Sequence, residues 1–121
     1  MLQHVTLEVR PDQVRDCVAF WELLGFEEIA APPSLRHRFT WVQREGTQIH
    51  LVPNDDPAIP TEGHTAIVQP DGDTIARLEA HGFEPRPGSN AWDAPRWFVH
   101  DPAGHRVEVM SKPPVPPWPG E

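Results

Sequence analysis

Four side chains able to bind a metal ion stand at related positions in short strands of this sequence. His4 and His64 each open a strand, whereas His50 and Glu108 each lie in the middle of one. Neutral imidazoles and a carboxylate suit a borderline divalent ion such as Zn, Ni, Fe(II), Co or Mn. No local spacing motif marks a site, and each residue alone has a simpler explanation. A strand histidine usually packs or makes a hydrogen bond, and Glu108 could point to solvent from a half-buried strand.

The elements that must position these side chains begin with a strand, a helix and three further strands. Residues 4–10 alternate apolar and polar residues with period two, which predicts a strand. Apolar residues then recur at helical spacing behind Pro11, and Gly25 is a suitable end for this helix. Further strands are expected at residues 26–30, 38–43 and 47–52.

The same order of elements returns in the second half of the chain. We expect a strand at residues 64–68, a helix capped by Asp71 or Asp73 and running to about residue 81, and a short strand at residues 83–86. The last two strands are expected at residues 96–100 and 105–110. The turn Asp101-Pro-Ala-Gly joins them, because proline and glycine supply the dihedral angles that such a turn needs.

Three anchors show that the two halves are related by duplication. Leu24-Gly-Phe-Glu recurs as His81-Gly-Phe-Glu at an offset of 57, and His4 recurs as His64 at an offset of 60. Ile49-His-Leu aligns with Val107-Glu-Val at an offset of 58. The four candidate ligands thus form two equivalent pairs. A pseudo-twofold axis relating the halves would bring all four to one metal site.

Composition limits the remaining possibilities. The chain has 121 residues, enough for one domain with a core, and a net charge of −8, which argues against nucleic acid or an anionic membrane as partner. Cys17 is alone, so no internal disulfide is expected. The N-terminus lacks the pattern of a signal peptide, and no apolar stretch is long enough to span a membrane. We expect a soluble cytoplasmic protein.

The chain resembles the vicinal oxygen chelate superfamily, which includes glyoxalase I, bleomycin-resistance protein and extradiol dioxygenases. The resemblance covers residues 2–111 and is strongest in five segments: HVTLEV, LLGF, QIHLV, HTAIV and DPAGHRVEV. It implies an α+β fold of two tandem βαβββ modules that form a cupped eight-stranded mixed sheet around a shared cavity. It also implies that His4, His50, His64 and Glu108 are the ligands of one divalent metal ion per chain.

No single branch of the superfamily fits the sequence. Glyoxalase I usually has a carboxylate at the position of His50, and the epimerases tend to have glutamine there. Fosfomycin-resistance enzymes share the triad His4, His64 and Glu108, but their cation-binding loop is not recognisable between Pro87 and Pro95. Extradiol dioxygenases commonly use a catalytic tyrosine, and this chain has no tyrosine.

Other residues are weaker candidates. Trp41, Trp97 and Phe98 lie on strands that should line the cavity, where core packing is at least as good an explanation as substrate contact. Trp92, in a polar loop, is a candidate for a mobile lid. Arg96, equivalent to Arg38 across the repeat, could bind an anionic substrate, although solvated surface arginines are the simpler reading. The other histidines are expected at the surface or in turns: His37, His81, His100 and His105.

Three functions remain open, and the third of them is a module that keeps the site but acts together with another protein. The first is a metal-dependent enzyme, a lyase, isomerase or dioxygenase that binds neighbouring substrate oxygens on the metal, with Glu108 or His50 as the base and with Trp41, Trp92, Arg96 and Phe98 as substrate contacts. The second is a metal-free protein that sequesters a small molecule.

We expect one domain over residues 1–112, made of modules 1–55 and 63–112 joined by linker 56–62, and a proline-rich tail at residues 113–121. We also expect a homodimer.

Overall fold

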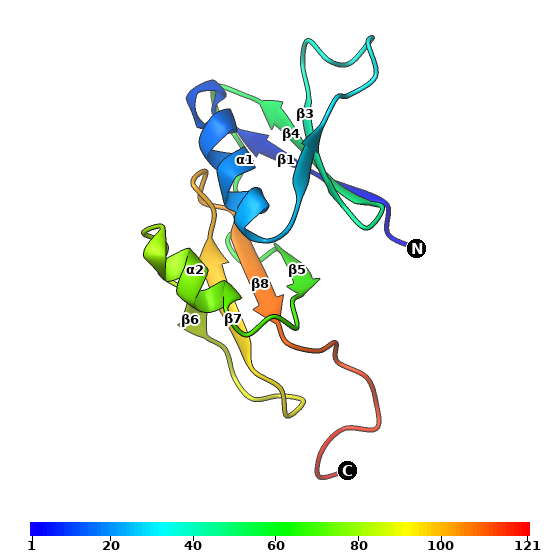
Figure 1. The fold of residues 1–121 in the computed structure, drawn as a ribbon, viewed down its shortest axis with the longest axis vertical. Coiled ribbons are helices and arrows are strands. Elements are labelled where there is room, and N and C mark those ends of the chain that lie inside the picture. The colour runs from blue at the N-terminus through cyan, green and yellow to red at the C-terminus, as the bar shows by residue number, and fades with distance from the viewer. The chain divides into compact units, whose positions relative to one another are not determined.

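The computed structural model describes residues 1–121 and divides them into two compact units. One unit contains Met1–Pro60 and Asp101–His105, and the other contains Thr61–His100 and Arg106–Glu121. Each unit holds one α-helix and one four-stranded sheet (Figure 1). The eight expected strands are therefore present, as two sheets of four. No helix of the structure is long and apolar enough to cross a membrane.

The first sheet has its first and last strands paired in parallel. Its strands lie in the order β1 (His4–Val9), β4 (Thr47–Pro53), β3 (Thr40–Arg44) and β2 (Glu27–Ile29). β1 and β4 are parallel, and the other neighbours are antiparallel. One face carries Val42 and Ile49, which are fully buried together with Phe20 and Trp21 of α1 (Val14–Leu23). The opposite face carries the residues that alternate with them, among them His50 and Trp41.

The second sheet repeats this arrangement. Its strands lie in the order β5 (His64–Val68), β8 (Arg106–Met110), β7 (Arg96–His100) and β6 (Arg86–Pro87), with β5 and β8 parallel. Ile75, in α2 (Thr74–Ala80), lines a cavity of about 250 Å³ with Trp97 and Val109. Helix α2 therefore covers the face that carries Trp97, and the face that carries Glu108 is the other one.

The ends of the two helices confirm the internal repeat in detail. Gly25 and Gly82 both have φ of +88°, a conformation that costs glycine little and other residues much. The amide of Gly25 donates to the Glu22 carbonyl at 3.0 Å, and that of Gly82 donates to the Glu79 carbonyl at 3.0 Å. The backbone amide of the phenylalanine that follows each glycine donates a second hydrogen bond, 3.1 Å long in both cases, to the carbonyl five residues earlier.

The turn between β7 and β8 belongs to the first unit. Asp101 is buried, and its Oδ1 accepts hydrogen bonds from the amides of Ala103 and His105 at 2.9 and 2.8 Å. His105 donates from Nε2 to the Glu8 carbonyl at 2.7 Å. Burial is the main cause that raises the pKa of the Asp101 carboxyl. The expectation that His105 is a surface or turn residue is half right, because it lies in the turn but its side chain is buried.

The sequence predicted most element boundaries to within two residues, with two differences. β6 covers only Arg86–Pro87, because Phe83 is used to close the end of α2. Asp73 occupies the N-cap position of α2, but its side chain makes no capping bond. Asp71 accepts from the Asp73 amide at 2.8 Å and from Arg77 at 3.3 Å, so it organises the turn that precedes the helix.

Candidate functional site

The first pair of predicted ligands lies on the face of the first sheet that is opposite helix α1. Strand register pairs Thr6 with His50 and Trp41 with His50, so alternation places His4, His50 and Trp41 on one face. The His50 ring lies between the other two rings. Its centroid is 4.0 Å from that of His4, with planes 15° apart, and 3.9 Å from that of Trp41, with planes 1° apart.

Glutamine side chains fix which nitrogen of His50 carries the hydrogen. Gln48 donates from its amide nitrogen to Gln43 at 2.9 Å, which leaves the Gln48 oxygen facing His50 Nε2 at 2.8 Å. Nε2 must therefore donate, and only Nδ1 keeps a lone pair in the neutral ring. Burial, and then the proximity of His4, lowers the pKa of His50, so the ring is neutral at pH 7.

The stacked rings do not direct their lone pairs at a common point. An imidazole binds a metal in its own plane, about 2.0–2.1 Å from the nitrogen. Planes 15° apart with centroids 4.0 Å apart keep the lone pairs of His4 and His50 in two nearly parallel planes, which do not meet near the rings. For both residues to hold the same ion, one ring must leave the stack. The structure thus brings these two predicted ligands together, but in a packing arrangement.

The second pair of predicted ligands has a different geometry. His64 Nε2 lies 3.0 Å from Glu108 Oε1, and His64 Nδ1 donates to the Glu62 carbonyl at 2.8 Å. In the neutral ring, Nε2 then carries a lone pair that faces a carboxylate oxygen. Two acceptors at this distance need a positive charge between them, either a proton or a metal ion. A carbonyl that fixes the outer nitrogen is also the usual support of a metal-binding histidine. The donor set of this pair fits a divalent ion.

Arg96 occupies the other oxygen of Glu108. Its Nη1 lies 3.1 Å from Glu108 Oε2, and the side chains of both residues are mostly buried, with 18% and 6% exposed. Nε and Nη2 of Arg96 donate to the carbonyl and hydroxyl of Ser89 at 2.9 and 3.0 Å. A Cβ on Gly88 would lie 2.9 Å from the Phe98 ring and 3.0 Å from Arg96 Nε, so the loop packs closely over this arginine only because residue 88 is glycine.

Two of the other predicted substrate contacts, Trp92 and Phe98, lie around Arg96. The guanidinium carbon of Arg96 lies 4.9 Å from the Trp92 ring and 5.2 Å from the Phe98 ring. Phe98 meets His64 edge to face, at 5.5 Å between ring centroids. Trp92 donates from Nε1 to the Lys112 carbonyl at 3.0 Å, which ties its loop to the start of the tail. Trp41 and Phe98 therefore lie on the ligand faces, and Trp97 lies on the opposite, helix-covered face.

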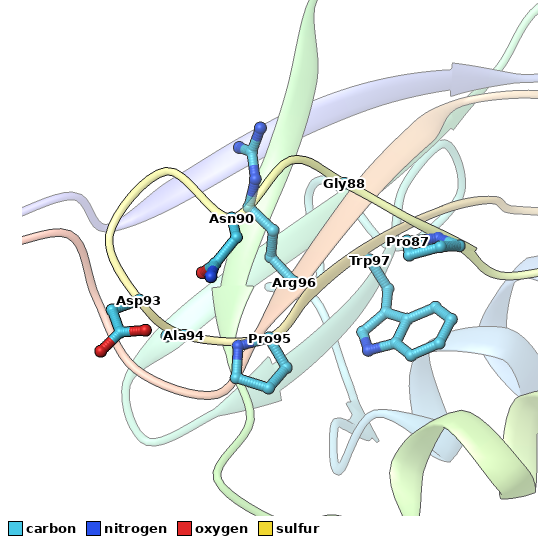
Figure 2. Close-up of a pocket in the computed structure, with 8 residues that line it drawn as sticks. All are labelled: Pro87, Gly88, Asn90, Asp93, Ala94, Pro95, Arg96 and Trp97. Carbon is cyan, nitrogen blue, oxygen red and sulfur yellow. The ribbon is translucent and has the colours of Figure 1, made fainter.

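A cavity of about 230 Å³ lies under the loop before β7 (Figure 2). Figure 2 shows Arg96 and Trp97 leaving this strand in opposite directions, as alternation requires. Of the candidate residues named from the sequence, Arg96 and Trp97 line this cavity, and none of the predicted ligands does. Within neither unit do three histidine, cysteine or acidic side chains gather at a metal-binding spacing.

Three residues that shape the site were not identified from the sequence. Gln43 and Gln48 set the His50 tautomer, and Arg106 lies over the Phe98 ring at 3.9 Å. Alternation along β8 already places Arg106 on the face of Glu108, so that signal was present in the pattern. Nothing in the sequence marks the glutamine pair.

Two related βαβββ units, with histidines and a glutamate on the faces opposite their helices, define the class of this protein. Residues 2–109 match the model of the Glyoxalase/Bleomycin resistance protein/Dioxygenase superfamily, and the chain belongs to this superfamily.

Solved structures with the same fold cover nearly the whole chain. A protein from Bacillus anthracis described as of the glyoxalase family is 26% identical, with a TM-score of 0.81 over 91% of this chain and 93% of that one. A FosX fosfomycin resistance protein from Listeria monocytogenes, an E126Q mutant in complex with Mn(II) and 1S,2S-dihydroxypropylphosphonic acid, is 22% identical, with a TM-score of 0.73 over 93% and 90%. A lactoylglutathione lyase from Agrobacterium tumefaciens is 18% identical, with a TM-score of 0.67 over 91% and 92%. No curated protein matches the chain.

Proposed function

We propose that this protein is a divalent-metal-dependent enzyme that acts on a small oxygenated substrate. The observation that carries the proposal is the facing pair of acceptors, His64 Nε2 and Glu108 Oε1, 3.0 Å apart with the other ring nitrogen fixed by a carbonyl. The proposed ligands are His4, His64 and Glu108, with His50 as the fourth, and the ion is Zn, Ni, Fe(II), Co or Mn. The complex of the FosX relative with Mn(II) supports a metal role for this fold.

The residues of the second sheet also suit proton transfer. A bound divalent ion supplies Lewis acidity, which polarises an oxygen of the substrate. Glu108 is the proposed base, because it is buried and Arg96 holds only its Oε2, so that Oε1, if it loosened from the ion, could accept a proton from a carbon beside that oxygen. Arg96 holds Oε2 and thereby orients the carboxylate. Trp41, Trp92 and Phe98 are the proposed apolar contacts of the substrate. His50 is the alternative base, since it is neutral at pH 7.

The second candidate function is metal-free binding of a small molecule. The observation that favours it is the stack of His4, His50 and Trp41, in which the two histidines make ring contacts and their lone pairs do not converge. Such a face could bind a flat apolar ligand without any ion.

Metal content separates the two functions. Protein stripped with a chelator and reconstituted should bind about one ion per chain, measured by elemental analysis and by titration calorimetry. Replacing His64 with alanine should abolish tight binding, because a metal site depends on all its ligands together. His81→Ala is the matched control, since His81 is exposed and its Nδ1 bonds only to the Arg77 carbonyl. If the wild type binds much less than one ion per chain and His64→Ala does not change this amount, the metal-dependent enzyme is contradicted and the metal-free function is supported.

We also propose that the protein is a homodimer. β1 and β5 are edge strands of the two sheets, and β5 exposes His64, Ala66 and Val68 along one face. Unpaired edges and exposed apolar residues are commonly covered by a second copy. Light scattering should give twice the chain mass of 13.7 kDa at micromolar concentration. A mass of one chain over that range would contradict the dimer.

A further inference from the structure

The face of the second sheet that carries Glu108 is rich in positive charge. Register places arginines from three strands on it, and histidines from two. These residues are Arg86, Arg96, Arg106, His64 and His100. The face thus holds three of the ten lysine and arginine residues of a chain whose net charge is −8. Glu108 is the single carboxylate among the residues paired across these strands.

Both oxygens of that carboxylate are already in use. Oε1 faces His64 and Oε2 accepts from Arg96. Arg106 is therefore left without an anionic partner. Its guanidinium makes no hydrogen bond and no ion pair in the structure, and its recorded contact is with the Phe98 ring, at 3.9 Å.

Arg106 is unusual among the arginines of this chain. Most of the others donate to an acceptor, such as Arg15 to Glu28 at 2.8 and 3.0 Å and Arg77 to Asp71 at 3.3 Å. Arg38 has no acceptor either, but it is exposed, so water can satisfy its donors. Arg106 is half-buried against an aromatic ring. A partly desolvated guanidinium with free donors is suited to bind an oxyanion.

Arg96 extends the same surface. Its guanidinium carbon lies 5.2 Å from the Phe98 ring, so both arginines rest against this phenylalanine. Ser89 and Glu108 accept from three of its nitrogen atoms, which holds the planar group in one orientation. A guanidinium fixed in this way still has N–H groups for a ligand, and loses little conformational entropy when the ligand binds.

We propose that Arg106, with Arg96 across the Phe98 ring, forms an anion subsite beside Glu108, and that the substrate carries a carboxylate or phosphoryl group. This inference rests on the proposed function, because it places the anionic end of the substrate next to the proposed base. The anionic group of the substrate would then pair with the positive charge of this face, for which the chain itself supplies no further carboxylate.

The test compares small ligands that differ in charge, using the full chain stripped of metal. Calorimetric or NMR titrations are made with lactate, inorganic phosphate and the neutral diol 1,2-propanediol. We expect both anions to bind in roughly the millimolar range and to weaken as NaCl is raised, and the diol not to bind. The tighter of the two anions identifies the group as carboxylate or phosphoryl. Equal binding of lactate and the diol would overturn the inference.

Variants assign the effect to Arg106. Arg106→Gln should weaken the anion about tenfold or more, the scale of a lost charge-assisted hydrogen bond. Arg106→Lys keeps the charge without the planar fork and should lose less. Arg86→Gln is the matched control, on the same face but exposed and 3.7 Å from Glu84, and should change affinity by less than about twofold. Equal affinities in Arg106→Gln and Arg86→Gln, with both proteins folded, would refute the subsite.

Metal titration of the same variants separates the two proposals. Arg106→Gln should bind metal as wild type does, because Arg106 is not among the proposed ligands. Metal binding without any preference for anions contradicts only the subsite. Anion binding by a protein that never takes up metal contradicts the proposed enzyme and leaves the subsite standing.

Discussion

Glu108 offers a test of the site that needs neither substrate nor metal. Two substitutions separate its charge from its shape. In Glu108→Gln, the amide oxygen can still accept from Arg96, and the amide nitrogen can donate to the lone pair of His64 Nε2. Both contacts, 3.1 and 3.0 Å in the wild type, are kept as hydrogen bonds, but without the charge of the carboxylate. Glu108→Ala removes both and leaves Arg96, 18% exposed, without its carboxylate.

The magnitudes follow from these contacts. A hydrogen bond to a charged group is worth about 1.5–3 kcal/mol and a neutral one about 0.5–1.5, so the glutamine should cost about 1 kcal/mol. Breaking a buried ion pair costs about 3–5 kcal/mol, and the partial exposure of Arg96 favours the lower end, about 3 kcal/mol. For a chain of this size these values correspond to Tm losses of roughly 3–6 °C and 10–15 °C.

Chemical and thermal denaturation of chelator-treated protein measures both values. Glu84→Ala is the control, because its contact with Arg86 is exposed and should contribute almost nothing. The reasoning fails if the alanine and glutamine variants of Glu108 are equally stable. That result would show that the carboxylate does not hold Arg96 in solution.

Three further predictions concern groups outside that pair. Because the pKa of His50 is lowered in the fold, the unfolded chain binds the proton more tightly than the folded chain does. The free energy of unfolding should therefore stay constant above about pH 6.5 and fall as the pH drops below it. Denaturation at several pH values should show that His50→Gln reduces this fall. Burial raises the pKa of the Cys17 thiol to about 12, so Cys17 should react with a thiol reagent only at the rate of unfolding. Gly25→Ala and Gly82→Ala should each cost about 1–2 kcal/mol in denaturant titrations, since both positions have φ of +88°. Because the two glycines are equivalent across the repeat, the two variants should lose the same free energy of unfolding.

The sequence was sufficient for the fold because the fold depends on periodicity. Alternation of period two set the faces of the strands, and glycine marked both helix ends. The same alternation, combined with the parallel pairing of β1 with β4 and of β5 with β8 in the structure, places His4 on the face of His50 and His64 on the face of Glu108. It could not distinguish the two pairs, because the difference lies in side-chain rotation. His50 is stacked between rings and His64 faces a carboxylate, and only three-dimensional packing decides between these arrangements.

Buried polar groups were harder to predict than exposed ones. His105 follows a glycine in a turn, which is typical of a surface position. It is buried because its ring bonds to the Glu8 carbonyl, which lies far away in sequence. A contact between residues 97 positions apart leaves no trace in local patterns. Arg106 was overlooked for a related reason, since an arginine in an alternating strand is expected to face water, and here it lies against Phe98.

His50 can act as the fourth ligand of the proposed metal site only if its ring leaves the stack. Ring stacking contributes about 0.5–1.5 kcal/mol per pair beyond burial, so release from both His4 and Trp41 should cost about 1–3 kcal/mol. Structural Zn²⁺ sites gain about 10–16 kcal/mol in total, several kcal/mol for each of four ligands. The stack is therefore weak enough to be broken by a metal bond and strong enough to persist without one. Without an ion it holds His50 beside His4, where burial and then His4 lower the pKa of His50, and an ion that takes His50 as fourth ligand must draw its ring out of the stack.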